Sequence, residues 1–323
     1  MEIKEIQLDG NRAYRLSNEH LSVVVTALGA GIFSLEYYGT KMTLTHRNIK
    51  DFLFDTGYHG KTVGRIAGRL EKGVFAYGGH SYQIDQNEGP NTLHGGAKGF
   101  SFREFEGKIA NDELTLTYHS KDGEEGFPGD VLFTVKYKLE GDSLLVKFLS
   151  TPSVDTPLNF TNHSYFNLGE ASIEHTIMRI ASGKTETYTV DLIPLGLKES
   201  PACLDFRKGK EIGRDIEDPL LHETRTNGYD HCFYLDEKKE GEAPIALIGK
   251  HFQMEIETSL PAIQIYSSNY FDGEADASNG EKFKQHDSVA MEPVYVPNDF
   301  DSMMNFAHQT KEDYIRYSFK RRD

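Results

Sequence analysis

Apolar and polar residues alternate along much of the chain in short runs that end at turn-forming residues. At 113–119 the side chains of Leu114, Leu116 and Tyr118 share one face, and at 131–139 every second residue is apolar. This period of two is typical of half-buried strands and differs from the longer period of a helix. We therefore predict a strand over each segment.

Turn signals between such runs predict antiparallel hairpins. A Glu-Gly-Asp-Ser turn at 140–143 leads from the second strand into an apolar run at 144–149, which indicates a meander. A Gly-Gly pair separates 73–76 from 81–86 in the same way and predicts another hairpin.

The pattern as a whole predicts an all-β fold with few short helices. No long amphipathic helix, low-complexity tract or clear repeat divides the chain, so we expect one domain over residues 1–323. The charged segment 236–242 is expected to be an exposed hairpin loop. Many short strands are typical of a large antiparallel sandwich or barrel, and the alternation alone does not choose between them.

Charge and cysteine content narrow the possible partners. Lys and Arg number 35 against 50 Asp and Glu, and the resulting charge of −15 would repel nucleic acid and anionic membranes. We therefore expect a small-molecule partner, with no nucleic acid and no membrane. The longest apolar stretch, 21–35, is too short and too interrupted to span a bilayer. The charged N-terminus and the two cysteines without a CxxC pair favour a reducing, cytoplasmic location.

A polar face within a strand-like segment supplies the first chemical candidate. Over 157–168, alternation would place four side chains on one face, namely Thr161, His163, Tyr165 and Asn167. His163 is a candidate general acid, because an imidazolium can donate a proton near neutral pH. The alternative is a structural histidine that is hydrogen-bonded inside a sheet.

Further candidates lie in three other segments. Glu292 stands between apolar residues, where desolvation should raise its pKa toward that of a useful general base. Asp230 begins a predicted strand and could accept hydrogen bonds from two ligand hydroxyls, unless it only caps a turn. His94 precedes Gly95 and Gly96, which allow a tight turn that brings the imidazole near a ligand; an exposed turn is the alternative.

Other motifs give weaker evidence of function. Arg65 and Arg69 could each donate fixed hydrogen bonds to ligand oxygens, although arginines are usually surface charges. The residue types of a zinc site occur in His94, His163, Asp230 and His231. No HxH or HExxH spacing supports such a site, and no GxGxxG, Walker or Gly-x-Ser-x-Gly motif occurs. We therefore expect no metal and no cofactor.

Six segments, in order over nearly the whole chain, carry a family resemblance. They are Val-Thr-Ala-Leu-Gly-Ala-Gly-Ile at 25–32, Gly-Arg-Ile-Ala-Gly-Arg-Leu at 64–70, Asn-Thr-Leu-His-Gly-Gly at 91–96, Asp-Gly-Glu-Glu-Gly-Phe-Pro-Gly at 122–129, Thr-Asn-His-Ser-Tyr-Phe-Asn-Leu at 161–168 and Gly-Tyr-Asp-His at 228–231. The series resembles the aldose 1-epimerase (galactose mutarotase) family. The resemblance implies a single large β-sandwich with a sugar on its concave face. It also implies an isomerase that interconverts the α and β anomers of free hexoses such as galactose and glucose.

The resemblance also assigns roles to individual residues. His163 matches the general acid of the family and Glu292 its general base. Arg69, His94, Asp230 and Gln264 match its sugar-binding positions. Tyr165, which shares the predicted polar face with His163, is also expected to bind the substrate. In the implied mechanism Glu292 removes the proton of the C1 hydroxyl while His163 protonates the ring oxygen. No metal, nucleotide or redox cofactor is required.

Some positions depart from the family pattern and leave the preferred hexose open. Gly68 stands where many members have Asn, Ser267 and Ser268 replace Thr-Gly, and Pro293 and Val294 replace Thr-Gln. The alternatives are a non-catalytic sugar-binding or regulatory protein, a glycoside hydrolase or lyase on a related sandwich, and an epimerase for a different or phosphorylated aldose. A monomer or homodimer is expected.

Overall fold

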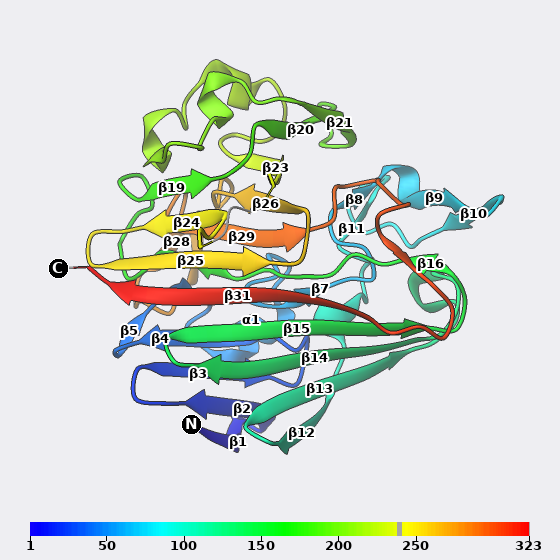
Figure 1. Cartoon of the computed structure of the whole chain (residues 1–323), viewed down its shortest axis with the longest axis horizontal. Helices are drawn as coiled ribbons and strands as arrows, with labels where there is room; N and C mark the ends of the chain where they lie inside the picture. Colours follow the sequence, from blue (N-terminus) through cyan, green and yellow to red (C-terminus); the bar gives the residue numbers. More distant parts are fainter. Residues whose placement is uncertain (238–240, 323) are drawn as a thin grey trace.

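The computed structural model describes residues 1–237 and 241–322 (Figure 1). Strands dominate the described residues, and α1 (Ile49–Phe54) is the one α-helix among them, so the all-β prediction is confirmed. None of the described helices has the length and hydropathy that a membrane crossing needs. The predicted hairpin loop at 236–242 falls on residues 238–240, which lie outside the described part.

A nine-stranded antiparallel sheet forms one layer of the molecule. In spatial order its strands are β12 (Glu106–Ala110), β13 (Glu113–Ser120), β14 (Val131–Glu140), β15 (Ser143–Pro152), β31 (Lys311–Arg321), β25 (Phe252–Thr258), β24 (Ile245–Ile248), β19 (Ile177–Ile180) and β22 (Lys210–Glu211). In β14 every second side chain is buried, as the alternation predicts. The predicted meander is confirmed, because β13, β14 and β15 are consecutive antiparallel neighbours.

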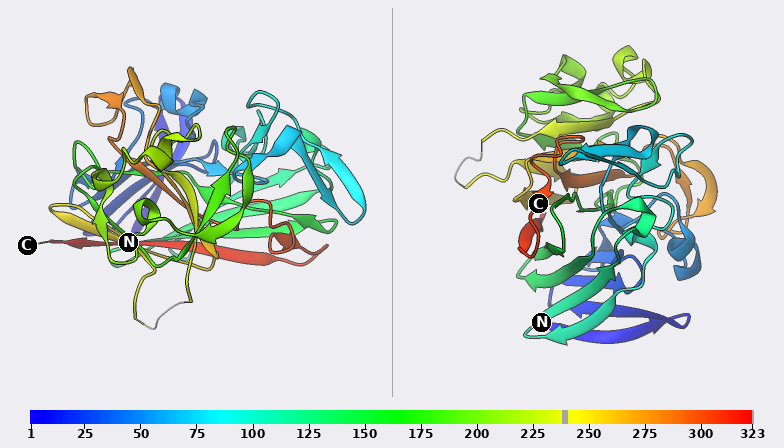
Figure 2. Two further views of the ribbon diagram at one scale, coloured as in Figure 1. Left: turned by 90° about the horizontal axis from the view of Figure 1, so that it is seen from above. Right: turned by 90° about the vertical axis from the view of Figure 1, so that its right-hand side faces the viewer.

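Two further sheets form the opposing layer. A five-stranded sheet contains β1 (Glu2–Leu8), β2 (Asn11–Ser17), β3 (Leu21–Thr26), β4 (Ile32–Tyr37) and β5 (Thr40–Lys41). A seven-stranded sheet has the order β21 (Pro194–Glu199), β20 (Lys184–Tyr188), β23 (Asp230–Tyr234), β26 (Ala262–Tyr266), β29 (Val289–Val294), β18 (Tyr165–Phe166) and β6 (Thr43–Leu44). Figure 2 shows the long strand β31, in red, along one side of the molecule.

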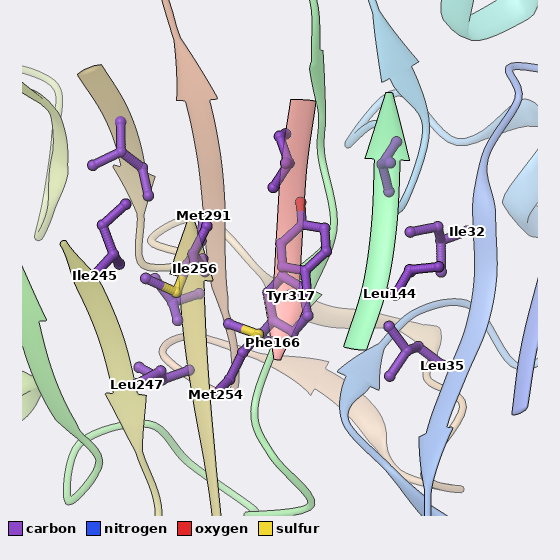
Figure 3. Close-up of a cluster of buried hydrophobic side chains, with 14 of the residues drawn as sticks. Ile32, Leu35, Leu144, Phe166, Ile245, Leu247, Met254, Ile256, Met291 and Tyr317 are labelled. Atoms are coloured by element: carbon purple, nitrogen blue, oxygen red, sulfur yellow. The ribbon is translucent and has the colours of Figure 1, made fainter. Parts of the chain in front are cut away.

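One cluster of buried hydrophobic side chains connects the three sheets. Figure 3 shows members from each of them, among them Met291 of β29, Leu144 of β15 and Ile32 of β4. This apolar interior is the main stabilising contribution to the fold, because burial removes each of these side chains from water.

Alternation gives the seven-stranded sheet two different faces. Ile263 and Ile265 of β26 and Met291 of β29 belong to the hydrophobic core. Gln264 and Glu292 lie opposite each other in the register of the same two strands. Because successive side chains point to opposite faces, these two polar residues project from the face away from the core. The sheet therefore packs on one face and offers polar groups on the other.

Short strand pairs and 3-10 turns occur between the strands of the three sheets in the described residues. The pairs are β9 (Val74–Tyr77) with β10 (His80–Gln83), β8 (Arg69–Leu70) with β11 (Thr92–Leu93), β16 (Thr156–Pro157) with β30 (Met304–Asn305), β7 (Thr62–Val63) with β17 (Thr161–Asn162), and β27 (Asp272–Asp276) with β28 (Lys282–Lys284). The 3-10 turns are η1 (Glu71–Gly73), η2 (Phe100–Phe102), η3 (Glu124–Gly126), η4 (Ala202–Leu204), η5 (Ile212–Arg214) and η6 (Pro219–His222). The pair β9 and β10 confirms the predicted Gly-Gly hairpin.

The continuous strand predicted over 157–168 is wrong. The segment instead contributes to β16, β17 and β18, which pair with different partners. Thr161 and Asn167 are buried and do not face the site described below, whereas His163 and Tyr165 do. Simple alternation failed because the chain crosses the interior and changes partner every few residues.

Candidate active site

A cavity of about 420 Å³ lies on the polar face of the seven-stranded sheet. This volume is within the range of roughly 300–1,000 Å³ that small-molecule sites occupy. All seven residues expected from the sequence line it: Arg69, His94, His163, Tyr165, Asp230, Gln264 and Glu292. The fold thus brings into one cavity side chains from well-separated segments of the chain.

Adjacent strands position three of these side chains. Cys232 pairs with Gln264 and Gln264 with Glu292, so β23, β26 and β29 run side by side in register. Asp230 lies two residues before Cys232, and all three cavity-lining side chains therefore project from one face. The side-chain amide of Gln264 donates to Asp230 Oδ1 at 2.6 Å.

His163 comes from a different direction, on the connection between β17 and β18. Its backbone N–H donates to the carbonyl of Lys61 at 2.9 Å, and its own carbonyl accepts from the N–H of Gly60 at 2.8 Å. These two bonds fix the backbone of His163 through both its N–H and its carbonyl group. The imidazole Nε2 then lies 3.4 Å from Oε1 of Glu292.

Burial sets the protonation of this pair. His163 is 5% exposed and Glu292 is 2% exposed. Desolvation raises the pKa of Glu292 well above its usual range, and the nearby Asp230 adds to the effect while Arg69 opposes it. The raised pKa that the sequence predicts for Glu292 is therefore confirmed. Burial also lowers the pKa of His163 to about 3, with a further contribution from His59. The lowered pKa of His163 favours the neutral imidazole over the imidazolium expected from the sequence, and the raised pKa of Glu292 favours its protonated form.

The geometry around His94 defines its tautomer. The backbone N–H of Gly68 donates to His94 Nδ1 at 3.2 Å, so Nδ1 carries a lone pair. Burial, together with His163 and Arg69, lowers the pKa of His94 well below its usual range. A neutral imidazole that accepts at Nδ1 carries its proton on Nε2, which leaves an N–H donor for a ligand.

Arg69 is held by a partner that sequence reasoning missed. Its guanidinium donates to both carboxylate oxygens of Glu88, at 2.7 and 2.8 Å. The remaining terminal nitrogen lies 3.9 Å from Asp230 Oδ2. No sequence motif marks Glu88, which lies in the loop before β11. Arg65, which seemed equivalent to Arg69, is buried elsewhere and donates to Ser120 and to the carbonyl of Gly129.

Aromatic rings complete the wall. The hydroxyl of Tyr165 donates to the carbonyl of Gly57 at 3.0 Å, so its oxygen keeps acceptor capacity toward the cavity. Tyr58, another residue missed from the sequence, places its ring 4.8 Å from that of His94. In a chain without tryptophan, such rings are the apolar surfaces available to a ligand.

The zinc set considered from the sequence does not form as a unit. His231 does not line the cavity, and its Nδ1 accepts from the backbone N–H of Asp230 at 3.1 Å. His94, His163 and Glu292 do offer ligand atoms within 4.8 Å of one another. Their chemistry would suit a divalent cation, and His163 Nδ1 has no hydrogen-bond partner among the described residues.

Comparison with known proteins places this geometry in a family. The family model described as aldose 1-epimerase matches residues 12–304. Galactose mutarotase of Sus scrofa is 32% identical over 297 residues, which cover 88% of this chain and 85% of that protein. Aldose 1-epimerase of Escherichia coli is 31% identical over 250 residues, which cover 74% of this chain and 71% of that protein. The chain belongs to the aldose 1-epimerase family.

Solved structures agree with this aldose 1-epimerase assignment at the level of the fold. The crystal structure of galactose 1-epimerase from Lactobacillus acidophilus matches with a TM-score of 0.90 at 24% identity, over 100% of this chain and 99% of that chain. The predicted sandwich fold and the predicted enzyme class, an isomerase of the aldose 1-epimerase type, are confirmed.

The departures from the family pattern differ in their relation to the site. Gly68 and Val294 line the cavity. Ser267 and Ser268 are buried outside it. Ser267 Oγ donates to the carbonyl of Tyr229, and Ser268 Oγ donates to the carbonyl of Ser288. Pro293 points away from the cavity wall that Glu292 and Val294 form. Gly68 and Val294 are therefore the departures that border the cavity.

Burial of neutral histidines predicts acid lability. The pKa of His163 is lowered to about 3 and that of His231 to about 4 by desolvation, whereas a histidine in an unfolded chain titrates near ~6.5. Between these values the unfolded chain binds protons that the native protein does not. The contribution of these histidines to the free energy of unfolding is therefore expected to be fully present above pH ~6.5. It should decrease as the pH falls toward ~4. His231 alone accounts for roughly 3 kcal/mol of this loss.

Urea unfolding at a series of pH values measures this effect. His231→Leu should flatten the slope below pH ~6.5 because it removes one of the protonation sites. His175→Leu is the matched control, since the His175 side chain is 91% exposed and should leave the slope unchanged. A midpoint that stays constant from pH ~7.5 to ~5 in the wild type would contradict the prediction.

Proposed function

We propose that this protein interconverts the α and β anomers of a free hexose such as galactose or glucose by acid–base ring opening and reclosure. The observation that carries the proposal is the buried pair of His163 Nε2 and Glu292 Oε1, 3.4 Å apart, in a cavity with several fixed hydrogen-bonding groups. Two proton-transfer groups placed together are what the simultaneous change at C1 and at the ring oxygen requires.

This pair alone can supply and accept the two protons that are transferred in ring opening. In the cyclic sugar complex, Glu292 as carboxylate takes the proton of the C1 hydroxyl while His163 as imidazolium protonates the ring oxygen, and the C1–ring oxygen bond breaks. The open-chain aldehyde is then accompanied by a protonated carboxyl and a neutral imidazole. Rotation about C1–C2 presents the other face of the carbonyl, and the reverse transfers close the ring.

Burial assists the opening step in this scheme. The ionic form of the pair and the neutral form contain the same number of protons and differ by one transfer. Desolvation favours the neutral form, as the opposite pKa shifts of His163 and Glu292 indicate. Since the neutral form accompanies the open-chain sugar, the apolar surroundings lower the energy of that intermediate relative to the charged cyclic complex.

The remaining polar groups are suited to holding the sugar still during rotation. Arg69 and the Nε2–H of His94 donate, Asp230 accepts, and Gln264 fixes Asp230 through the 2.6 Å bond. Fixed groups of this kind keep the reacting atoms in place while the open chain is flexible. Tyr165 contributes ring surface and an acceptor oxygen.

The charge of the cavity favours a free hexose over a phosphorylated one. Within the described part of the chain, Arg69 is the one lysine or arginine side chain that lines the cavity. Its charge is already paired with Glu88, and Asp230 and Glu292 lie nearby. A phosphate group would meet no unpaired lysine or arginine there, and this disfavours the phosphorylated substrate considered from the sequence.

Polarimetry tests the proposal directly. Freshly dissolved α-galactose and α-glucose should approach anomeric equilibrium faster with the protein than in buffer, and glucose 6-phosphate should show little or no acceleration. Sugar binding measured by calorimetry without any acceleration would instead support the non-catalytic binding protein. A monomeric or dimeric state and a cytoplasmic location stay predictions.

Glu88→Gln is expected to raise KM for the sugar about fivefold, an effect of roughly 1 kcal/mol, with little change in kcat. The neutral amide of glutamine has only one acceptor oxygen, so it cannot accept both guanidinium N–H groups as the carboxylate does. Arg69 therefore loses its fixed position. Initial polarimetric rates over a range of sugar concentrations measure both constants. Glu71→Gln removes an exposed ion pair of 3.3 Å with Lys72 and is the matched control. An unchanged KM for Glu88→Gln would mean that the ion pair does not position Arg69.

A further inference from the structure

A second polar cluster lines the same cavity and takes no part in the proposed reaction. It consists of His46, Asp55 and His59, which follow one another closely in the chain around helix α1. Each offers one ligand atom, and the three atoms lie within 4.8 Å of one another. We propose that these three residues form a binding site for a first-row divalent cation such as Zn²⁺, with an open coordination position toward the sugar cavity.

Local structure places the carboxylate at the centre of this cluster. Asp55 ends helix α1, and its carboxylate accepts the backbone N–H groups of Gly57 and His59, each at 2.8 Å. The Lys61 ammonium donates to the backbone carbonyl of Asp55 at 3.0 Å and secures the helix end. The carboxylate is thereby held between the two imidazoles.

The distances suit ligands that converge on one ion. His46 Nε2 lies 3.1 Å from Asp55 Oδ1, and His59 Nδ1 lies 2.9 Å from Asp55 Oδ2. Ligand atoms around a tetrahedral zinc ion, with bonds of about 2.0–2.1 Å, are separated by roughly 3.3 Å. A small adjustment of the rings would therefore bring the three groups into coordination distance.

Unsatisfied buried atoms point to a missing partner. His46 is 7% exposed, and neither of its ring nitrogens has a hydrogen-bond partner in the described structure. Its Nε2 nevertheless lies 3.1 Å from Asp55 Oδ1. The Nδ1 of His59 bonds to the Asp55 carboxylate, so His46 Nε2 is the converging ligand atom that lacks a hydrogen-bond partner among the described residues. Buried polar nitrogens rarely stay unpaired, and a coordinated cation would account for the orientation of His46.

The charge and surroundings agree with a cation. Asp55 supplies the carboxylate of the cluster, and each of its two oxygens faces an imidazole nitrogen. The His59 ring stacks on Tyr165 at 4.3 Å and on Phe271 at 5.1 Å, and His46 meets Phe283 at 5.1 Å. Two imidazoles and a carboxylate inside an apolar shell are a ligand set for zinc and similar ions.

The site would border the reacting groups without joining them. Tyr165 separates the two clusters, with its ring 4.3 Å from that of His59 and 5.0 Å from that of His163. All three proposed ligands line the cavity, so water or a sugar hydroxyl fills the open position. The metal site is independent of the mutarotation proposal, since one can fail without the other.

Cobalt binding tests the site on the full-length protein. After treatment with a chelator, Co²⁺ is titrated and its visible absorption and stoichiometry are recorded, followed by competition with Zn²⁺. We expect one Co²⁺ per chain with the intense absorption of a tetrahedral site, and an affinity at least about 100-fold lower in His46→Gln and His59→Gln. Glu292→Gln disrupts the other possible cluster, with His94 and His163, and should keep the full affinity.

Two results would overturn the proposal. One is the absence of stoichiometric binding to the wild type. The other is Co²⁺ binding that is lost in Glu292→Gln but is unchanged in His46→Gln. Should a ligand variant fail to fold, anomalous diffraction from wild-type crystals grown with Zn²⁺ decides: a peak among His46, Asp55 and His59 supports the site, and a peak only beside Glu292 contradicts it.

Discussion

Glu292→Gln is expected to lower kcat for mutarotation about 10³-fold, within the roughly 10²–10⁴-fold range of a general acid–base residue. The amide has nearly the volume of the carboxyl group and can occupy the same place opposite Gln264 in β29. It cannot accept the C1 proton or return it, so the loss should appear in kcat with a smaller change in KM. Polarimetry with saturating α-galactose measures the effect.

Glu186→Gln is the matched control for this substitution. Glu186 is a second buried glutamate, 1% exposed, on a strand of the same sheet, and burial raises its pKa as it does for Glu292. It does not line the cavity. The control should leave kcat unchanged even if it reduces stability. Equal kcat values for Glu292→Gln and the wild type would assign the base to another group.

His163→Gln is expected to lower kcat by a similar factor, about 10²–10⁴. The amide can replace hydrogen bonds of the imidazole but cannot protonate the ring oxygen. His286→Asn is the matched control: His286 is a buried histidine that does not line the cavity, and it has a positive φ of 58° that asparagine tolerates. It should retain kcat. A fall in kcat of only a few fold for His163→Gln would show that water or another residue is the acid.

The pH profile of the wild type provides a second test of this pair. Burial lowers the pKa of His163 to about 3 and raises that of Glu292. Above about pH 3 the pair therefore holds one proton, whichever group carries it, until the pH reaches the raised pKa of Glu292. We expect no acidic limb in kcat/KM as the pH falls from ~7 to ~5, where the protein stays folded. An acidic limb with its midpoint near ~6.5 would instead mean that the free protein must carry an imidazolium.

Local patterns were sufficient for part of this description. Alternating apolar residues predicted β13, β14 and the meander correctly, because the period of a strand depends only on neighbouring residues. The same reasoning failed at 157–168, where long-range partners set the backbone path. The alternation of apolar residues therefore predicts long strands within one sheet correctly. It does not predict the path of short strands that change partner.

The sequence predicted seven residues that line the cavity, but not Glu88 and Tyr58 and not the electrostatics of the site. Ordered motifs identified His163 and Glu292 through the family resemblance, and the apolar neighbours of Glu292 indicated its raised pKa. Nothing local indicated that burial would also keep His163 neutral. The partner of Arg69 was equally hidden, because the ion pair with Glu88 joins a strand to a separate loop.

The sequence by itself determined the strand-rich fold class, the family and the residues that can carry acid–base chemistry, because these depend on residue type, spacing and order. Only the tertiary structure decided the 3.4 Å approach of His163 to Glu292 and the desolvation that shifts both pKa values. It also decided that His46 and His59 meet around one carboxylate without any metal-binding spacing. Distance and burial arise from the packing of remote segments, and residue spacing along the chain does not contain them.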